Sequence, residues 1–151
     1  MERNILSVMK PSPRKVVWND WPALAASIAI PIVWLIHFGF PYLHRGAAPL
    51  PIWFAGIASV VFTALLLWRY RRIAWLFAHG QSAWGQVTGL RMVKDRGRLE
   101  FEFMHQDALV ASWMPVHKTK DVLLLSRGDR VEVLFDLHMP TRAIVRRLYS
   151  I

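Results

Sequence analysis

Two long stretches without a charged side chain constrain this 151-residue chain more than any other feature. The first runs from Pro22 to Tyr42 and the second from Pro51 to Leu67. Each is close to the roughly 20 apolar residues that a helix needs to cross a hydrocarbon core about 30 Å thick. A pair of core helices in a soluble protein is the alternative, but uncharged runs of this length seldom stand side by side in so short a chain. The sequence therefore predicts a transmembrane helical hairpin over residues 21–68.

Basic residues flank the predicted hairpin, whereas the connection between its helices carries only Arg45. Because positive charge stays on the cytoplasmic side, we expect a multi-pass protein with both termini cytoplasmic and the Tyr42–Leu50 turn external. A cleaved signal peptide is the rival interpretation of the first run. Its apolar core exceeds the typical length of about 7–15 residues, and a second span follows at once. The residues expected to contact lipid headgroups are Lys10, Arg14, Lys15, Arg69, Arg71 and Arg72.

Aromatic side chains mark both ends of the two runs. Amphipathic rings prefer the headgroup layer of a bilayer. The residues expected at the membrane interfaces are Trp18, Trp21, Tyr42, Trp53, Trp68 and Tyr70. Trp34 lies in the middle of the first run, where we expect it to face lipid or a partner helix.

Small residues recur at helical spacing in both runs. They allow two helix backbones to approach closely, either inside the hairpin or against helices of another protein. The candidate helix-packing residues are Ala25, Ala29, Trp34, Ala55, Ser59 and Thr63. Asp20 is a candidate N-cap for the first helix, and Pro31 should bend that helix because it removes one backbone hydrogen bond.

The segments that flank the hairpin have different characters. Residues 1–20 form a basic cytoplasmic tail, in which Pro11 and Pro13 indicate an irregular Met1–Lys15 segment. Residues 69–81 continue the second helix beyond the membrane and end at Gly80, a residue that fits a C-terminal cap. We expect this extension either to bend along the membrane surface or to brace the domain that follows it.

His37 is the one ionisable side chain well inside a predicted span. Such residues are functional hypotheses by default, and a neutral imidazole is able to ligate a haem or chlorophyll-type metal. A structural role is the competing interpretation, with His37 hydrogen-bonded to a neighbouring helix or reaching toward the external interface. No second histidine stands opposite it in the other run, which argues against a haem ligated by two histidines of the hairpin.

From residue 82 onward, apolar side chains alternate with period two, which is typical of strands with one buried face. The expected strands are Gln86–Lys94, Leu99–His105, a strand around Leu109–Trp113, Val131–Asp136 and Arg142–Leu148. Phe101, Phe103, Val131, Val133 and Phe135 are expected to point inward. In the third strand, Leu109, Ala111 and Trp113 are read as the apolar face.

Turn sequences separate these strands. The segment 95–98 and the pair Gln106–Asp107 each predict a tight turn, and 138–140 a third. The insert from His117 to Arg127 is expected to be a crossing loop or one helical turn. The fold class predicted is membrane α plus small all-β: a two-helix transmembrane hairpin followed, over residues 82–151, by a five-stranded antiparallel barrel of OB or SH3-like type.

The run from Gly128 to Asp136, followed by Pro140, Thr141, Arg142 and Ala143, resembles the closing signature of a bacterial family. That family consists of membrane-anchored proteins of unknown function, with one or more helices beside a small β-domain. The resemblance covers roughly residues 80–148, and Gly85-Gln86-Val87 fits the first strand of the family. It departs at Leu137, where the family usually has proline. The resemblance implies a bacterial cytoplasmic (inner) membrane and carries over no catalytic residue; a weaker one links the chain to anchored OB-fold partners of stomatin-like proteins.

Composition narrows the possible chemistry. The chain has no cysteine, which excludes disulfides, thiolate metal sites and cysteine nucleophiles. Its six histidines show no metal-ligand spacing, and no phosphate-binding or nucleophile-elbow motif is present. Glu100 and Glu102 share one strand face, where we expect a solvated pair that faces Arg or Lys on a neighbouring strand. We therefore predict no catalytic residues, no metal, no cofactor and no small-molecule substrate.

The net charge of +9 is uneven, since residues 1–81 hold eight basic and two acidic residues. Positive charge retained on the cytoplasmic side explains most of this excess, so anionic lipids are expected partners and nucleic acid is not. The first functional hypothesis is a non-enzymatic accessory or scaffold subunit of a larger membrane complex, for example an energy-transducing one, with other integral membrane subunits as partners. The second is a membrane-tethered binding module for a soluble protein, anionic lipid or nucleic acid, with Arg91, Lys94, Arg96 and Arg98 as its basic edge. The third is a cofactor-bearing subunit that uses His37.

Overall fold

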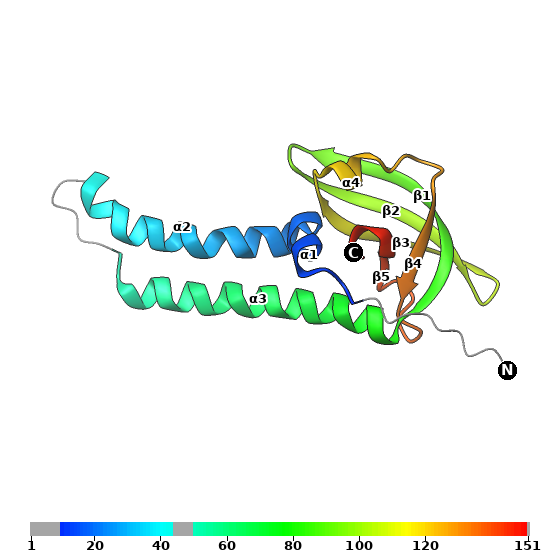
Figure 1. Cartoon of the computed structure of the whole chain (residues 1–151), viewed down its shortest axis with the longest axis horizontal. Helices are drawn as coiled ribbons and strands as arrows, with labels where there is room; N and C mark the ends of the chain where they lie inside the picture. The colour runs from blue at the N-terminus through cyan, green and yellow to red at the C-terminus, as the bar shows by residue number, and fades with distance from the viewer. Residues whose placement is uncertain (1–9, 44–49, 151) are drawn as a thin grey trace.

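The computed structural model describes residues 10–43 and 50–150. In chain order these residues form α1 (Pro13–Asn19), α2 (Trp21–Leu43), α3 (Ile52–His79), β1 (Gln81–Val93), β2 (Arg96–His105), β3 (Ala108–His117), α4 (Lys120–Leu123), β4 (Arg130–Phe135), β5 (Ala143–Val145) and the 3-10 helix η1 (Arg146–Leu148). The helices α2 and α3 lie side by side as a long hairpin, and all strands gather at one end of it (Figure 1). The Arg45 connection lies outside the described residues.

Both helices of the hairpin are long and apolar enough to cross a membrane. In the most apolar 18-residue segment of each helix, only 17% of the residues of α2 and 6% of those of α3 are buried. A core helix of a soluble protein would bury most of this surface, because burial of apolar side chains is what stabilises it. The exposed apolar side chains instead surround the hairpin, as at Leu35, Phe38, Ile57 and Val60.

The second helix continues without a break beyond Trp68. Its last turns bury Ile73 and Leu76 against the strands, so the segment braces the β-domain rather than lying apart from it. Gly80 ends the helix with its N–H bonded to the Leu76 carbonyl at 2.9 Å, in an extended conformation. A Cβ at this position would collide with that carbonyl oxygen, which explains the glycine.

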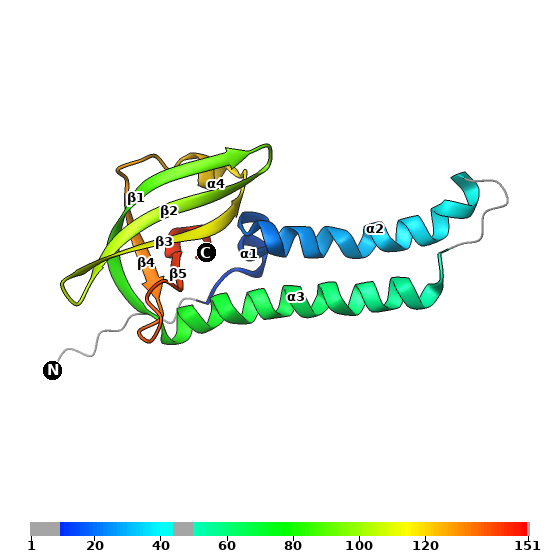
Figure 2. The same cartoon turned by 180° about the vertical axis from the view of Figure 1, so that it is seen from behind.

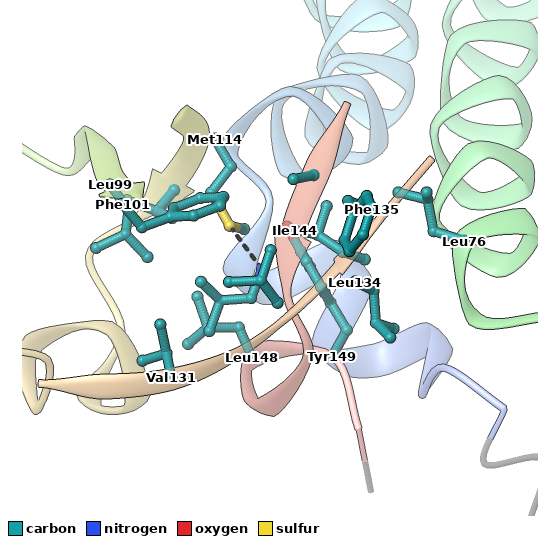
Figure 3. Close-up of a cluster of buried hydrophobic side chains, with 14 of the residues drawn as sticks. Leu76, Leu99, Phe101, Met114, Val131, Leu134, Phe135, Ile144, Leu148 and Tyr149 are labelled. Carbon is teal, nitrogen blue, oxygen red and sulfur yellow. Dashed lines mark hydrogen bonds between the residues drawn. The ribbon is translucent and has the colours of Figure 1, made fainter. Parts of the chain in front are cut away.

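The strands form one antiparallel sheet in the order β3-β2-β1-β4-β5 that curls into a nearly closed barrel. The long strand β1 pairs with both β2 and β4, and its register shifts between Val87 and Gly89. Side chains link β3 to the β5 end. The Ser112 hydroxyl donates to the Thr141 carbonyl at 2.7 Å, and the Val145 N–H points at the Met114 sulfur at 3.4 Å (Figure 3). The prediction of a five-stranded antiparallel barrel is confirmed, and its OB or SH3-like type stays a prediction.

The core of the barrel contains the five residues that the alternation predicted. Phe101, Phe103, Val131, Val133 and Phe135 are all buried. The helices add further side chains, since Val16 of α1 and Leu76 of α3 belong to the same cluster (Figure 3 shows Leu76). The core therefore crosses the boundaries proposed at residues 20 and 81.

The predicted face of the third strand is wrong. Leu109, Ala111 and Trp113 point outward, and the inward positions of β3 include Ser112, Met114 and Val116. The apolar run continues beyond Trp113 to Met114 and Val116, and the Ser112 hydroxyl on the same inward face is hydrogen-bonded to the Thr141 carbonyl. The predicted apolar face is thus an exposed one.

Four element boundaries also differ from the predictions. Pro13–Lys15 is not irregular but begins α1, since proline is well suited to the first positions of a helix. The strand β1 begins at Gln81, five residues before the expected start, and the first turn occupies Lys94–Asp95. The last strand ends at Val145, after which the chain forms η1.

Other local predictions are confirmed. Gln106 and Asp107 form a two-residue turn with φ of 49° and 61°. Gly128 has φ of 97°, a conformation that favours glycine. The insert contains one helical turn, α4, capped by the Thr119 hydroxyl.

Candidate functional site

A buried polar cluster joins the hairpin to the β-domain, and we call it the junction. Its centre is Asp20, whose side chain is fully buried between α1 and α2. One carboxylate oxygen accepts the Ala23 N–H at 3.0 Å, which confirms Asp20 as the N-cap of α2. Arg69 of α3 donates to both oxygens of the carboxylate, with Nε at 3.2 Å from Oδ1. The ion pair therefore ties the start of one helix to the far part of the other.

The C-terminal segment closes the junction from the side of the strands. The Tyr149 hydroxyl donates to Asp20 Oδ2 at 3.4 Å. Asn19 donates to the Leu148 carbonyl at 2.6 Å and accepts from the Thr119 hydroxyl at 2.7 Å. These contacts connect residues at least 100 positions apart, so the β-domain is held at a fixed place on the hairpin.

Burial also changes the acidity of the tyrosine in the junction. It raises the pKa of the Tyr149 phenol well above its usual value, because the phenolate would lose its solvation. The Asp20 carboxylate raises this pKa further, since a second negative charge beside it is unfavourable. The phenol therefore stays protonated and able to donate its hydrogen bond.

The predicted helix-packing residues divide into two groups. Trp34 donates its indole N–H to the Ser59 hydroxyl at 3.0 Å, and Ser59 donates to the Ala55 carbonyl at 2.8 Å. Trp34 thus contacts the second helix of its own hairpin. Ala55 is buried, whereas Thr63 is exposed. Ala25 and Ala29 are half-buried, while their neighbours Ala23 and Ala26 are fully enclosed.

His37 has a partner within the hairpin. Its Nδ1 lies 2.7 Å from the Leu50 carbonyl oxygen, and its ring packs edge-on against Trp34 and Phe38. This geometry matches the structural interpretation, in which the imidazole bonds across the hairpin. A cofactor bound by His37 stays a prediction.

The six predicted interface aromatics differ in their surroundings. Tyr42 and Trp53 are exposed at the end away from the strands, and Trp68 is exposed toward the other end. Trp18 is half-exposed, and Trp21 stacks on His117 with ring centroids 6.1 Å apart. Along α2, the 21 steps from Trp21 to Tyr42 rise about 32 Å at roughly 1.5 Å per residue, close to the thickness of a hydrocarbon core. Tyr70 differs, because it packs against the core of the β-domain.

The predicted lipid contacts need one correction. Lys10, Arg14, Arg71 and Arg72 are exposed, and Lys15 is half-buried. Arg69 is not available to a lipid headgroup, because its guanidinium is occupied by the buried Asp20.

The outer surface of the β-domain carries a groove that the sequence analysis did not identify, and we call it the distal groove. It has a volume of about 400 Å³ and is lined by Trp84, Gly85, Gln86, Glu102, Phe103, Met104, Leu109, Gly128 and Arg130. Trp84 is 60% and Leu109 62% exposed, and the Arg130 guanidinium lies 4.6 Å from the centre of the Trp84 ring. Met104 and Leu109 flank the β2–β3 turn, which points away from the hairpin (Figure 1). The alternation of outward aromatic and aliphatic residues on β1 and β3 was the available signal.

Acidic and histidine side chains do not cluster among the described residues in a way that could hold a metal ion. Glu100 lies 3.8 Å from Arg91 of the neighbouring strand β1, as expected for this residue, and 3.2 Å from Arg98 of its own strand. Comparisons of the chain with models of known protein families, with curated proteins and with solved structures found no match.

Proposed function

We propose that the chain is a non-catalytic accessory or scaffold subunit of a larger bacterial membrane protein complex, for example an energy-transducing one. In this proposal the hairpin spans the cytoplasmic membrane and packs laterally against other integral subunits. The β-domain then covers the cytoplasmic face of the complex. The membrane-anchored β-domain family that residues 80–148 resemble is proposed as the family of the chain, on the Gly128–Asp136 sequence run alone.

The exposed apolar surface of the hairpin supports membrane insertion. Side chains such as Leu35 and Val60 are 74% and 70% exposed. Soluble proteins rarely expose an apolar surface as long as this hairpin to water. Lipid or neighbouring helices would cover this surface. Because the hairpin has only two helices, much of it is left for contact with integral subunits.

The distal groove is the observation that carries the scaffold role. Trp84, Met104 and Leu109 are more than half exposed, and the last two flank the β2–β3 turn, which points away from the hairpin (Figure 1). Lipid bound to the hairpin would not reach them, and grouped apolar side chains of this kind are typical of protein interfaces. The junction fixes the height of the groove above the proposed membrane, as a scaffold requires.

Affinity purification in a mild detergent, followed by mass spectrometry, tests this role. We expect the Leu109→Asp variant to remain in the membrane. The amount of other subunits that co-purify with it should be at least about tenfold lower than with the wild type, as expected for an interface hot spot. The matched control is Leu137→Asp, an exposed leucine outside the groove, which should leave recovery unchanged. Equal recovery with both variants would remove the groove as the contact and leave the scaffold role without support.

The membrane-tethered binding module is the second candidate function, and a basic surface near the hairpin favours it.

The cofactor-bearing subunit is the third candidate function. A visible absorption spectrum of the purified chain would test it, with His37→Ala as the comparison.

A further inference from the structure

The turn between β1 and β2 lies beside the start of the apolar hairpin. The Lys118 N–H donates to the Asp95 carbonyl at 2.9 Å, and Arg96 pairs across the strands with His117. His117 in turn has Nδ1 3.2 Å from the Trp18 carbonyl and stacks on Trp21. Both views show the turn at the same level along the hairpin axis as α1 and the first residues of α2 (Figures 1 and 2).

Basic side chains are concentrated at this level, and we call them the basic rim. The rim consists of Arg14 and Lys15 on α1, Lys94 and Arg96 at the turn, and Lys118 and Lys120 before and in α4. Within the described part of the chain, Lys94, Arg96 and Lys118 form no ion pair. These three cations outnumber Asp95, the acidic residue of the same turn, so a positive charge remains there.

The two halves of the rim are continuous. Arg14, Lys15 and Lys120 line an open cleft of about 420 Å³ between α1 and α4, together with the half-exposed ring of Trp18. Lys118 connects this cleft to the β1–β2 turn, where Val93 is 63% exposed beside Lys94. Exposed cations next to a tryptophan and a small apolar tip match the chemistry of a lipid headgroup layer.

We propose that the basic rim binds the headgroups of anionic phospholipids. The inference rests on the proposed insertion of the hairpin. It places the β1–β2 turn at the membrane surface, although this turn lies some 25 residues after the last apolar residue of the span. The position of the rim favours lipid over nucleic acid, because headgroups would already surround the adjacent start of α2. Lipid contact at this turn would fix the tilt of the β-domain on the membrane.

The absence of cysteine permits a direct test with single labels on the full chain. A fluorophore on Val93→Cys is measured in nanodiscs that contain lipids with a nitroxide on the headgroup. One set holds phosphatidylcholine alone, and the other adds phosphatidylglycerol. We expect stronger quenching in the anionic nanodiscs. Lys94→Glu should weaken the contact by about 25-fold, since it changes two charges at roughly fivefold each.

Three controls make the result decisive. Arg127→Glu makes the same charge change at an exposed position outside the rim and should leave quenching at position 93 unchanged. A label on Leu109→Cys in the distal groove should stay unquenched. A label on Leu35→Cys should be quenched by nitroxides on the acyl chains, which reports insertion of the hairpin.

Quenching at position 93 that is absent, or equal in both nanodiscs, would overturn the lipid assignment while Leu35→Cys still supported insertion. Loss of quenching at Leu35→Cys would overturn insertion as well. Binding of a labelled oligonucleotide that Lys94→Glu abolishes, without any lipid effect, would assign the rim to nucleic acid and also overturn the proposal.

Discussion

At the residue scale, Asp20 and Arg69 decide how the two parts of the molecule meet. Asp20 is fully buried, and an unpaired carboxylate there would cost several kcal/mol. Arg69 supplies the compensating charge from the helix on the other side of the hairpin. The two residues stand just outside the two apolar runs, yet their pairing depends on the relative depth of α2 and α3. That depth is set by the connection and by packing, so the sequence alone did not predict the pair.

Removing the guanidinium should destabilise the junction strongly. We expect Arg69→Met to lower the free energy of unfolding by about 3–5 kcal/mol, because it leaves the Asp20 charge buried without a partner. Thermal unfolding in detergent, followed by tryptophan fluorescence, measures the change. Arg71→Met is the matched control, since Arg71 is exposed and should change stability by less than about 0.5 kcal/mol. Adding Asp20→Asn to Arg69→Met should restore part of the loss; no restoration would contradict the charge argument.

The tyrosine of the junction should make stability sensitive to high pH. The pKa of Tyr149 is raised in the folded chain, whereas the unfolded chain ionises this phenol near pH 10. The protonated Tyr149 phenol therefore makes its full contribution to stability below pH 10, and this contribution is lost as the pH rises through the pKa that the phenol has in the folded chain. We expect Tyr149→Phe to unfold with a flatter pH dependence above pH 10 than the wild type. Parallel curves for the two proteins would show that Tyr149 does not carry this dependence.

At the scale of elements, predictability depended on how sharply the two faces of a strand differ. In β2, the phenylalanines alternate with glutamates, and the buried face was predicted correctly. In β3 both faces are apolar, since Leu109 and Trp113 alternate with Val110 and Met114. Alternation alone does not choose between two such faces. The choice is made by the Ser112 hydroxyl bond and by the continuation of the inward face to Val116.

The short helix α1 also could not be predicted from the local sequence pattern. Two prolines indicated an irregular tail, but Pro13 stands at the helix start, where its missing N–H costs nothing. What stabilises α1 is tertiary, because Val16 is fully buried in the core of the β-domain. A seven-residue helix is not stable by itself in water, so no local pattern could reveal it.

The interior of β2 offers a test of the barrel core. Phe101→Ala should destabilise the full chain by about 3–5 kcal/mol, since it removes a ring from a fully buried site. The full chain is the correct sample, because Val16 and Leu76 complete the core from outside the strands. Met104→Ala on the exposed end of the same strand should have little effect on the unfolding temperature. Equal shifts for both substitutions would contradict the assigned faces of β2.

At the scale of the whole molecule, the segments before and after the hairpin form one unit. Asn19 of α1 bonds to the Leu148 carbonyl, and Ser12 donates its N–H to the Tyr149 carbonyl at 2.9 Å. A hairpin that spans a bilayer therefore has both of these segments on the same side. In the proposed topology this side is the cytoplasmic one, a prediction that depends on the basic residues around these segments and on the single Arg45 in the connection at the opposite end.

Single cysteines labelled with a membrane-impermeant maleimide test this topology in cells. We expect Lys10→Cys and Leu137→Cys to react only after the membrane is permeabilised, because both positions lie on the strand side of the hairpin. Tyr42→Cys, 87% exposed at the other end of α2, should react in intact cells. Labelling of Lys10→Cys and Leu137→Cys in intact cells, with Tyr42→Cys protected, would reverse the orientation. Labelling of Lys10→Cys and Leu137→Cys from opposite sides would contradict the shared core itself, since Val16 and the strands could not then pack together.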